Sequence, residues 1–308
     1  MILVTGASGF LGKYVCAELT RQGLDYHPHS REEDGNLLDY ETIRLRYNTN
    51  RPHTIIHLAA RVGGIGANQA QSYNFMSGNL QMGLNIVDLA LMWKSRVIMV
   101  STVCAYPAVP SIIPFVEDSL WEGFPELSNA GYGLAKRTLT QLLWEAQKQY
   151  NLKSITLNLA NLYGVGDSLD LETSHVIPAV FGKIAKAKRY GEKLVLWGDG
   201  SPTRDFLHVR DAASAVVAAS IPRYGLDMGP KNGINIGSGL ETSIKEMAYM
   251  ACDLMEFPEQ DVEWDNSYPN GQIRRVLNIE RAKALIGFTP SVKLEDGMRE
   301  IAEFYKRN

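Results

Sequence analysis

One short part of the chain carries four side chains that could together perform proton and hydride chemistry beside a ketone. Thr102 and Cys104 lie in the segment Ser-Thr-Val-Cys-Ala-Tyr-Pro, and Tyr132 and Lys136 lie in Gly-Tyr-Gly-Leu-Ala-Lys. The Tyr-x-x-x-Lys spacing places both side chains on one face of a helix. There we expect the ammonium to lower the pKa of the phenol from its ordinary value of about 10, so that it can act as a general acid or base. The same spacing occurs on many solvated helices, so its meaning depends on the elements around it.

The elements that would position these groups alternate between strands and helices. Apolar runs typical of buried strands cover 2–5, 25–29, 54–58, 96–100, 154–159 and 234–236. Segments with helical apolar spacing separate these runs, as at 13–22, 80–92 and 135–150. Alternation of this kind predicts an α/β protein with a Rossmann-type, doubly wound parallel sheet.

A glycine-rich turn follows the first strand and opens the first helix, in Thr5-Gly-Ala-Ser-Gly-Phe-Leu-Gly12. Glycines there permit a tight turn, close approach of a pyrophosphate and close packing of helix on sheet. The helix N-terminus offers N–H groups to the phosphates. A dinucleotide site is therefore predicted, with the spacing Gly-x-x-Gly-x-x-Gly. The contacts expected from this turn and from the ends of the next two strands are Gly6, Ser8, Gly9, Phe10, Leu11, Gly12, Ser30, Arg31, Leu38, Ala59 and Ala60.

The residues after the second strand favour NADP over NAD. Arg31 offers a fork of donors for a 2'-phosphate and Ser30 offers a hydroxyl, whereas NAD sites usually place a carboxylate there for the ribose. Glu32, Glu33 and Asp34 follow directly. Arg31 could therefore also be a solvated loop cation, and the choice of NADP is a hypothesis.

A smaller lobe is predicted where the strand and helix alternation loosens. After Gly164 the chain continues as polar loop, one helix at about 177–188 and a Gly/Pro-rich passage, and Ser243 caps a later helix. We assign 1–163 with 206–236 to the NADP-binding Rossmann domain. We assign 164–205 with 237–308 to a mixed α/β lobe that binds the substrate.

Composition excludes several classes of protein. The chain has 308 residues, 45% of them hydrophobic, and a formal charge of −3, so we expect an ordinary globular protein that binds no nucleic acid. Cys16, Cys104 and Cys252 are an odd number without Cys-x-x-Cys spacing, which argues against a disulfide framework and a zinc site. No metal is expected. No apolar run has the length of a membrane span, and the chain begins as a strand without a basic leader, so we expect a cytoplasmic protein.

The glycine turn, the hydroxyl of Thr102 and the Tyr132-x-x-x-Lys136 pair together resemble the extended short-chain dehydrogenase/reductase family over essentially the whole chain. Within it, further stretches resemble the GDP-L-fucose synthases. They are His57-Leu-Ala-Ala-Arg-Val-Gly-Gly-Ile, Cys104-Ala-Tyr-Pro, Ser-His175-Val-Ile-Pro-Ala and Trp197-Gly-Asp-Gly-Ser-Pro-Thr-Arg204-Asp-Phe-Leu-His-Val. The resemblance implies NADPH-dependent conversion of GDP-4-keto-6-deoxy-D-mannose to GDP-L-fucose. The reaction comprises epimerisation at C3 and C5 followed by reduction of the C4 ketone.

The resemblance also implies roles for matching residues. Tyr132 would protonate the C4 oxygen, Thr102 would hydrogen-bond it, and Lys136 would lower the phenol pKa and hold the nicotinamide ribose. Cys104 and His175 would be the base and the acid of epimerisation. The other expected substrate contacts are Asn161, which would also lie near the nicotinamide, and Val176, Lys183, Trp197, Arg204 and Arg275. Family members often carry arginine where Lys183 stands and lysine where Arg275 stands, which changes the donor geometry.

The chemistry of a ketone supports the assignment independently. Protons on the carbons beside a carbonyl are acidified, and inversion requires one group to remove a proton and another to return one from the opposite face. A thiol and an imidazole suit this task. Taken alone, Cys104 would more often be a small buried hydrophobe and His175 a structural residue. For Arg204 and Arg275 the alternative is a surface salt bridge, and for Trp197 it is core packing.

Other functions remain open from the sequence. The enzyme could act on another GDP-4-keto sugar, such as a heptose or a dideoxy sugar, or the chain could be a non-catalytic NADP-binding redox sensor. The apolar helices at 79–93 and 135–150 could form a four-helix homodimer interface, as is common in the family, or could be buried within the monomer.

Overall fold

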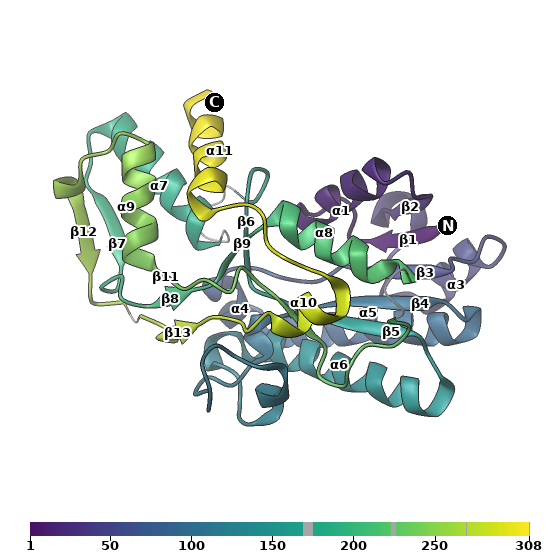
Figure 1. Cartoon of the computed structure of the whole chain (residues 1–308). Coiled ribbons are helices and arrows are strands. Elements are labelled where there is room, and N and C mark those ends of the chain that lie inside the picture. Colours follow the sequence, from purple (N-terminus) through teal and green to yellow (C-terminus); the bar gives the residue numbers. More distant parts are fainter. Residues whose placement is uncertain (169–174, 223–225, 269, 308) are drawn as a thin grey trace.

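Six parallel strands form the central sheet of the computed structural model, which describes residues 1–168, 175–222, 226–268 and 270–307 (Figure 1). The strand order is β10-β5-β4-β3-β1-β2. In chain order these strands are β1 (Ile2–Thr5), β2 (Tyr26–His29), β3 (Thr54–His57), β4 (Arg96–Thr102), β5 (Ser154–Leu159) and β10 (Ile234–Ile236). The predicted doubly wound parallel sheet is confirmed. Its strands are recognisable in sequence because helices cover both faces, which requires apolar residues on both sides of each strand.

Helices pack on the two faces in pairs. Figure 1 shows α1 (Phe10–Arg21) and α8 (Val209–Ser220) above the sheet and α5 (Ser72–Trp93) and α6 (Ala130–Tyr150) below it. The short helices α2 (Arg31–Asp34) and α3 (Tyr40–Tyr47) follow β2, and α4 (Ile65–Ala70) precedes α5. No helix within the described residues is both long enough and apolar enough to cross a membrane.

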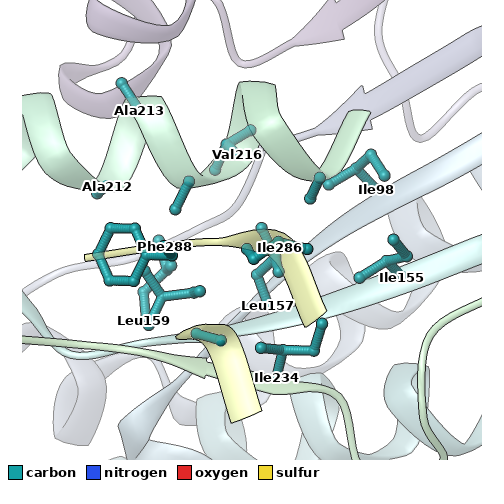
Figure 2. Close-up of a cluster of buried hydrophobic side chains, with 14 of the residues drawn as sticks. Ile98, Ile155, Leu157, Leu159, Ala212, Ala213, Val216, Ile234, Ile286 and Phe288 are labelled. Atoms are coloured by element: carbon teal, nitrogen blue, oxygen red, sulfur yellow. The ribbon is translucent and has the colours of Figure 1, made fainter. Parts of the chain in front are cut away.

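The core above the sheet includes a segment from late in the chain. Ile286 at the end of α10 (Glu280–Ile286) and Phe288 just after it pack with Leu157 of β5 and Val216 of α8 (Figure 2). The sequence-based boundaries placed these two residues in the substrate lobe. The division of the chain into two domains stays a prediction, and the packing of Ile286 and Phe288 places them with the sheet.

The remaining elements form a smaller α/β lobe with its own apolar core. Its helices are α7 (Val176–Tyr190), α9 (Ile244–Leu254) and α11 (Leu294–Arg307). Its strands are the parallel pair β7 (Leu194–Trp197) and β12 (Val262–Asp265), and the set β11 (Thr242–Ser243), β8 (Thr203–Arg204) and β13 (Arg274–Arg275). The predicted helix start at Ser243 is confirmed, because Ser243 and Glu246 form a capping box.

A buried carboxylate joins the two parts of the chain. Asp205 lies between β8 and β9 (Phe206–His208), and β9 pairs with β6 (Asn161–Tyr163). The Asp205 carboxylate accepts hydrogen bonds from Ser238 N at 2.8 Å, Ser238 Oγ at 2.7 Å, Gly239 N at 3.3 Å and Leu277 N at 3.3 Å. Gly237 permits this because a Cβ there would stand 2.2 Å from Asp205 Oδ2. One side chain therefore connects β9, the segment after β10 and the segment after β13.

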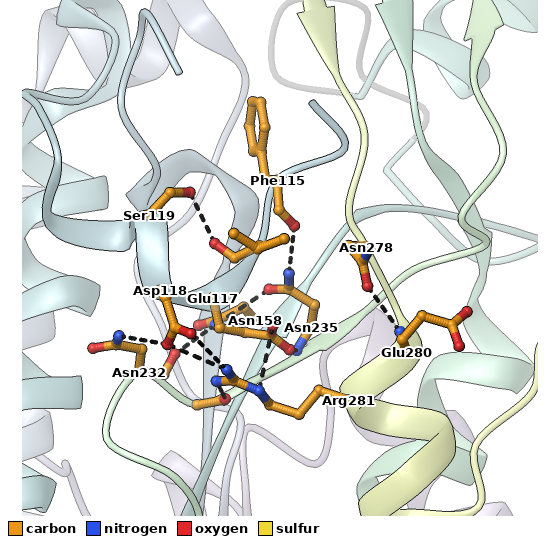
Figure 3. A network of polar contacts seen from close by, with 12 residues as sticks. Phe115, Glu117, Asp118, Ser119, Asn158, Asn232, Asn235, Asn278, Glu280 and Arg281 are labelled. Atoms are coloured by element: carbon orange, nitrogen blue, oxygen red, sulfur yellow. Dashed lines mark hydrogen bonds and ion pairs between the residues drawn. The ribbon is translucent and has the colours of Figure 1, made fainter. Parts of the chain in front are cut away.

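A polar network holds the loop between β4 and α6 against the sheet (Figure 3). Asn235 of β10 donates through Nδ2 to Phe115 O and through its backbone N–H to Glu117 Oε1, both at 2.9 Å. Arg281 of α10 lies 3.5 Å from Glu117 and 3.2 Å from Asp118. The Tyr106 hydroxyl donates to Asn235 Oδ1 at 2.6 Å. The network thus also fixes Tyr106, which is two residues after Cys104.

Truncating the core above the sheet should destabilise the protein. Leu157 is fully buried between β4 and β10. We expect Leu157→Ala to lower the free energy of unfolding by about 2–5 kcal/mol, through lost burial and a residual cavity. Leu240→Ala, at an exposed side chain, is the matched control and should change it by less than about 0.5 kcal/mol. Urea unfolding measures both, and equal effects of the two substitutions would contradict the assignment of this core.

Candidate active site

The glycine turn between β1 and α1 brings the backbone close to two neighbours. Gly6 has φ +70°, and a Cβ there would stand 2.7 Å from Ala59 N. A Cβ on Gly12 would stand 2.1 Å from Gly6 O. Gly9 is the N-cap of α1 and has no side chain to bond the first N–H groups of the helix. The turn is therefore a cradle at a helix N-terminus into which side chains cannot intrude, and it fits a pyrophosphate.

The carboxylate of Asp34, at the end of α2 just after β2, is bonded inside the protein. Asp34 is buried, and it accepts hydrogen bonds from Ser30 N at 2.9 Å and Arg46 Nε at 2.8 Å, with His27 Nε2 at 3.0 Å. Burial raises its pKa, but the bonds from Ser30 N and His27 outweigh burial and hold the pKa below its ordinary value. Asp34 is thus an internally paired carboxylate, whereas Arg31 is exposed. This leaves a cation rather than Asp34 available at the end of β2.

Two predicted cofactor contacts have local roles here. Ser30 caps α2, where its hydroxyl accepts from Glu33 N at 3.2 Å. Leu38 is partly buried in the core below the sheet. Beside the turn, Ala59 N donates to Thr5 Oγ1 at 3.3 Å, and Thr5 Oγ1 lies 2.8 Å from His57 Nδ1. Complete burial lowers the pKa of His57 to about 3, so this imidazole is neutral.

The carboxyl end of β4 and the start of α6 bring together the hydroxyl, the thiol and the phenol. Thr102 ends β4, and Cys104 lies in the following 3-10 turn, where its N–H donates to Thr102 Oγ1 at 3.2 Å. Helix α6 approaches this turn closely, since a Cβ on Gly133 would stand 2.3 Å from Cys104 O. Tyr132, beside Gly133, has a hydrogen bond with Thr102 and interacts electrostatically with the Cys104 sulfur.

The expected lowering of the Tyr132 pKa is wrong for this structure. Burial raises that pKa above its ordinary value, and Cys104 raises it further, while the hydrogen bond with Thr102 only partly opposes them. Lys136 is itself buried, and its Nζ donates to Val100 O at 2.9 Å. Burial lowers the pKa of Lys136 to about 8. Tyr132 is therefore a phenol that keeps its proton at neutral pH, which suits a proton donor.

Two nitrogen donors surround the Cys104 sulfur. Asn129 Nδ2 and Arg275 Nη1 each lie 3.5 Å from Sγ. Arg275 is buried, and its Nε donates to Gln272 Oε1 at 2.9 Å. Sequence reasoning missed Asn129 and Gln272. The position of Asn129, three residues before Tyr132 and directly before α6, was the only available signal.

A second, partly buried arginine lies next to Arg275. Arg204 Nη1 donates to Thr203 O and to Gln272 O, both at 2.7 Å. Burial and, to a smaller extent, the charge of Arg275 lower the pKa of Arg204 to about 10, although Cys104 opposes them. Among the described residues neither arginine forms an ion pair with a carboxylate. The surface salt-bridge alternative therefore does not describe either residue, and both guanidinium groups lie near the thiol.

His175 lies at the N-cap of α7, and its side chain is 44% exposed. Its Nδ1 lies 3.1 Å from Asp167 Oδ2, a partner that sequence reasoning missed. The hydrogen bond with Asp167 raises the His175 pKa above its ordinary value, although burial opposes it. Within the part of the chain that the structure describes, no hydrogen bond or ion pair joins His175 to Cys104, so their convergence on one sugar stays a prediction. Val176 begins α7 next to His175.

Aromatic residues mark the outer end of the site. Trp197 is 61% exposed and stacks on Tyr268, with ring centroids 4.3 Å apart and planes 5° apart. Lys183 Nζ lies 5.4 Å from the centroid of the Trp197 ring and donates to Val195 O at 3.0 Å. The core-packing alternative for Trp197 is wrong, and Tyr268 was missed. At the inner end, Asn161 Nδ2 donates to Asp205 O at 3.0 Å.

Comparison with known families agrees with this geometry. Residues 2–236 match the NAD dependent epimerase/dehydratase family. The chain belongs to this family. Its members are built on the same Rossmann-type sheet, and the resemblance drawn from the motifs is confirmed.

Individual relatives are similar over the full length. A GDP-L-fucose synthase from Sinorhizobium fredii is 33% identical over 310 residues, which are 100% of this chain and 96% of the relative. A GDP-L-colitose synthase from Yersinia pseudotuberculosis is 31% identical over 310 residues, with 99% and 97% covered. The crystal structure of a GDP-L-fucose synthetase from Naegleria fowleri bound to NADP is 26% identical, with TM-score 0.85, covering 100% of this chain and 94% of that one.

Removing the Asp167 charge should lower the His175 pKa. In Asp167→Asn the hydrogen bond to a carboxylate is lost while burial still disfavours the charged imidazole. NMR titration of the imidazole C–H signals, with His175→Gln for assignment, measures the change. Because the folded-state pKa is raised, the pair stabilises the wild type fully below the unfolded His pKa of about 6.5. That stabilisation is lost as pH rises through the folded-state pKa. An unchanged His175 titration in Asp167→Asn would contradict the interaction.

Proposed function

We propose that this protein converts GDP-4-keto-6-deoxy-D-mannose to GDP-L-fucose, by epimerisation at C3 and C5 and then reduction of the C4 ketone with NADPH. The observation that carries the proposal is the convergence of the Thr102 hydroxyl, the Cys104 thiol and the Tyr132 phenol at one end of β4, beside the buried Arg275 and the partly buried Arg204. Full-length relatives named GDP-L-fucose synthase support the same reading.

Residues after β1 and β2 and on α6 would hold NADPH, which supplies the hydride for C4 when bound. Gly6 and Gly12 leave room for the pyrophosphate at the N-terminus of α1. Arg31 would bind the 2'-phosphate, and Lys136 would hold the nicotinamide ribose. The neighbour solved with NADP supports this choice of cofactor.

In the reduction, Tyr132 donates a proton to the C4 oxygen as hydride reaches C4. Its raised pKa keeps the proton on the phenol until negative charge develops on that oxygen. Thr102 hydrogen-bonds the same oxygen. The Lys136 ammonium then stabilises the phenolate, and its pKa of about 8 keeps most of it charged at neutral pH.

In the epimerisation, the same two hydroxyl groups stabilise an enolate. Removal of the proton from C3 or C5 leaves a carbanion whose charge spreads onto the C4 oxygen, where Thr102 and Tyr132 donate. Cys104 would take that proton on one face of the ring. His175 would return a proton to the same carbon from the opposite face, and its raised pKa increases the protonated fraction available for this step.

Substrate capture would use the smaller lobe. Arg204 and Arg275 would bind the diphosphate, Lys183 and Trp197 would lie along the nucleotide, and Asn161 and Val176 would line the sugar end. The exposed face of Trp197 and the positive charge of the two arginines support this arrangement.

A second candidate substrate is a GDP-4-keto-3,6-dideoxy sugar. The relative named GDP-L-colitose synthase, 31% identical, favours it. Such a sugar has no hydroxyl at C3, so inversion would occur at C5 alone. A competition assay with the two purified keto sugars distinguishes the candidates, and a keto heptose can be included. The redox-sensor alternative is disfavoured because both Tyr132 and Lys136 are in place.

Two substitutions should separate the two half-reactions. In deuterated water with NADPH, product from the wild type should carry deuterium at C3 and C5. Cys104→Ser should abolish that incorporation and leave some C4 reduction, because its hydroxyl is a far weaker base. Tyr132→Phe should keep part of the exchange, because Thr102 still donates to the enolate oxygen, and should lower hydride transfer by about 10²- to 10⁴-fold through loss of the general acid. Product NMR and NADPH oxidation measure the two steps. Loss of both steps in both variants would refute this division of roles.

We also propose that the protein is a cytoplasmic homodimer that pairs the outer faces of α5 and α6. Tyr73, Leu84 and Met92 of α5 are exposed apolar side chains that a partner would cover. Leu84→Glu should shift the sedimentation coefficient from dimer to monomer, because a charge would enter the apolar interface. Leu240→Glu, at an exposed loop residue, should leave it unchanged. A monomeric wild type would contradict the dimer.

A further inference from the structure

Arg137 lies buried beside the turn that carries Cys104. It follows Lys136 on α6, and only 4% of it is exposed. Its Nε donates to Ala105 O at 2.8 Å, and its Nη2 donates to the same oxygen. Its Nη1 donates to Gly123 O at 2.8 Å. Arg137 thus binds the residue next to Cys104 with two donors of one planar group.

The interactions of this guanidinium differ from those of a salt bridge. Among the residues that the structure describes, no carboxylate lies within ion-pair distance of Arg137. Its other neighbour is Trp121, with the ring centroid 5.4 Å from Cζ. A buried cation is costly, and here only carbonyl dipoles and an aromatic face offset that cost. Burial accordingly lowers the Arg137 pKa, which the proximity of Tyr106 opposes. What this arrangement supplies is a rigid fork that fixes two backbone carbonyls.

The fork ties the thiol to the helix that carries the phenol. Cys104 and Ala105 belong to one 3-10 turn, whereas Tyr132 and Lys136 belong to α6. Lys136 does not bond this turn, because its Nζ donates to Val100 O of β4. The side chain of Arg137 therefore holds the Cys104 turn without contacting the groups assigned to reduction.

The same turn is held on its other side by the smaller lobe. Gln272 Nε2 donates to Pro107 O at 3.2 Å and to Ala108 O at 3.0 Å. Arg275 joins Gln272 to the Cys104 sulfur. Without Arg137, the segment around Cys104 would keep its bonds to Gln272 and to Asn235 of β10 but would lose this side-chain tie to α6.

We propose that Arg137 is a positioning residue that sets the Cys104 thiol relative to the Tyr132 phenol, and so governs epimerisation without touching the sugar. The inference rests on the proposed function for its kinetic consequence. A displacement of about 1 Å can cost on the order of 100-fold in rate. Loss of the Arg137 fork should therefore slow the thiol-dependent step far more than hydride transfer.

The kinetic test compares Arg137→Met and Arg137→Lys with a matched control. Arg96 is also buried at 6% exposure, and its guanidinium also donates to backbone carbonyls, those of Ala219 and Leu226 among them. It lies at the opposite end of β4 from Thr102. Arg96→Met therefore removes a buried fork away from the site, together with its 3.6 Å ion pair to Asp227.

Two rates are measured for each variant. Exchange is the incorporation of deuterium at C3 and C5 without NADPH, and reduction is NADPH oxidation with a keto sugar already inverted at both carbons. Arg137→Met should lower the ratio of exchange to reduction by about 10- to 100-fold. Arg137→Lys, which keeps the charge but not the fork, should lower it by less. Arg96→Met should leave the ratio as in the wild type.

A second measurement needs no substrate. Hydrogen exchange of peptides covering 103–107 reports the amide bonds of the turn, including Tyr106 N to Val103 O at 3.1 Å. Arg137→Met should speed this exchange and Arg96→Met should not. If the wild type incorporates no deuterium at C3 and C5, the proposed function is wrong. The amide-exchange measurement then still tests whether Arg137 stabilises the turn.

The proposal is overturned by either of two results. Arg137→Met could leave turn protection and the rate ratio as in the wild type, or Arg137→Met and Arg96→Met could lower both rates equally. Either result makes Arg137 a residue of general stability alone. If Arg137→Met does not fold, Arg137→Lys decides on the same two readouts.

Discussion

The site depends on the close approach of helix α6 to the backbone after β4. Gly133 makes this approach possible, since any Cβ there would collide with Cys104 O. Tyr132 precedes that glycine, and Lys136 and Arg137 follow it one helical turn later. A side chain at position 133 would separate the helix from the turn and with it the phenol from the thiol. Tyr132, the principal group of the proposed reduction, lies on the helix side of this contact. Cys104, the base of the proposed epimerisation, lies on the turn side.

Around this contact the protein concentrates positive charge that, among the residues the structure describes, is not paired with carboxylates. Lys136 and Arg137 bind carbonyl oxygens, Arg204 does the same, and Arg275 binds an amide oxygen and the Cys104 sulfur. The chain as a whole has a formal charge of −3, so the charge of the site is local. Cations that lack ionic partners retain their attraction for an incoming diphosphate, and burial strengthens that attraction because the local dielectric is low. The lowered pKa values of Lys136 and Arg204 express the cost of this arrangement.

The sheet could be predicted from sequence because parallel strands covered on both faces are continuous apolar runs. The glycine turn and the Tyr132 and Lys136 pair could also be recognised from sequence, because each is defined by a spacing of a few residues. The phenol pKa was predicted wrongly because burial of Tyr132, together with the nearby Cys104 sulfur, raises it, and both are set by tertiary structure. Asp167 and Gln272 were missed for a related reason. Each acts through a contact made after folding, and neither belongs to a recognisable spacing.

The packing of Phe288 on the sheet was also beyond sequence patterns. An apolar residue near the end of the chain indicates burial but does not say against which core. Its actual place follows from the course of the segment after β13, which returns to the sheet through α10. The Asp205 carboxylate sits where this return begins, and it joins three segments by backbone hydrogen bonds.

That junction has a consequence for how a nucleotide sugar enters. Swinging the smaller lobe outward would strip a buried carboxylate of its donors, a costly event in the low-dielectric interior. We therefore expect the smaller lobe to keep its position relative to the sheet during turnover. Entry and exit of the nucleotide sugar would then depend on rotamer changes of exposed side chains such as Trp197 and Tyr268 rather than on movement of the whole lobe.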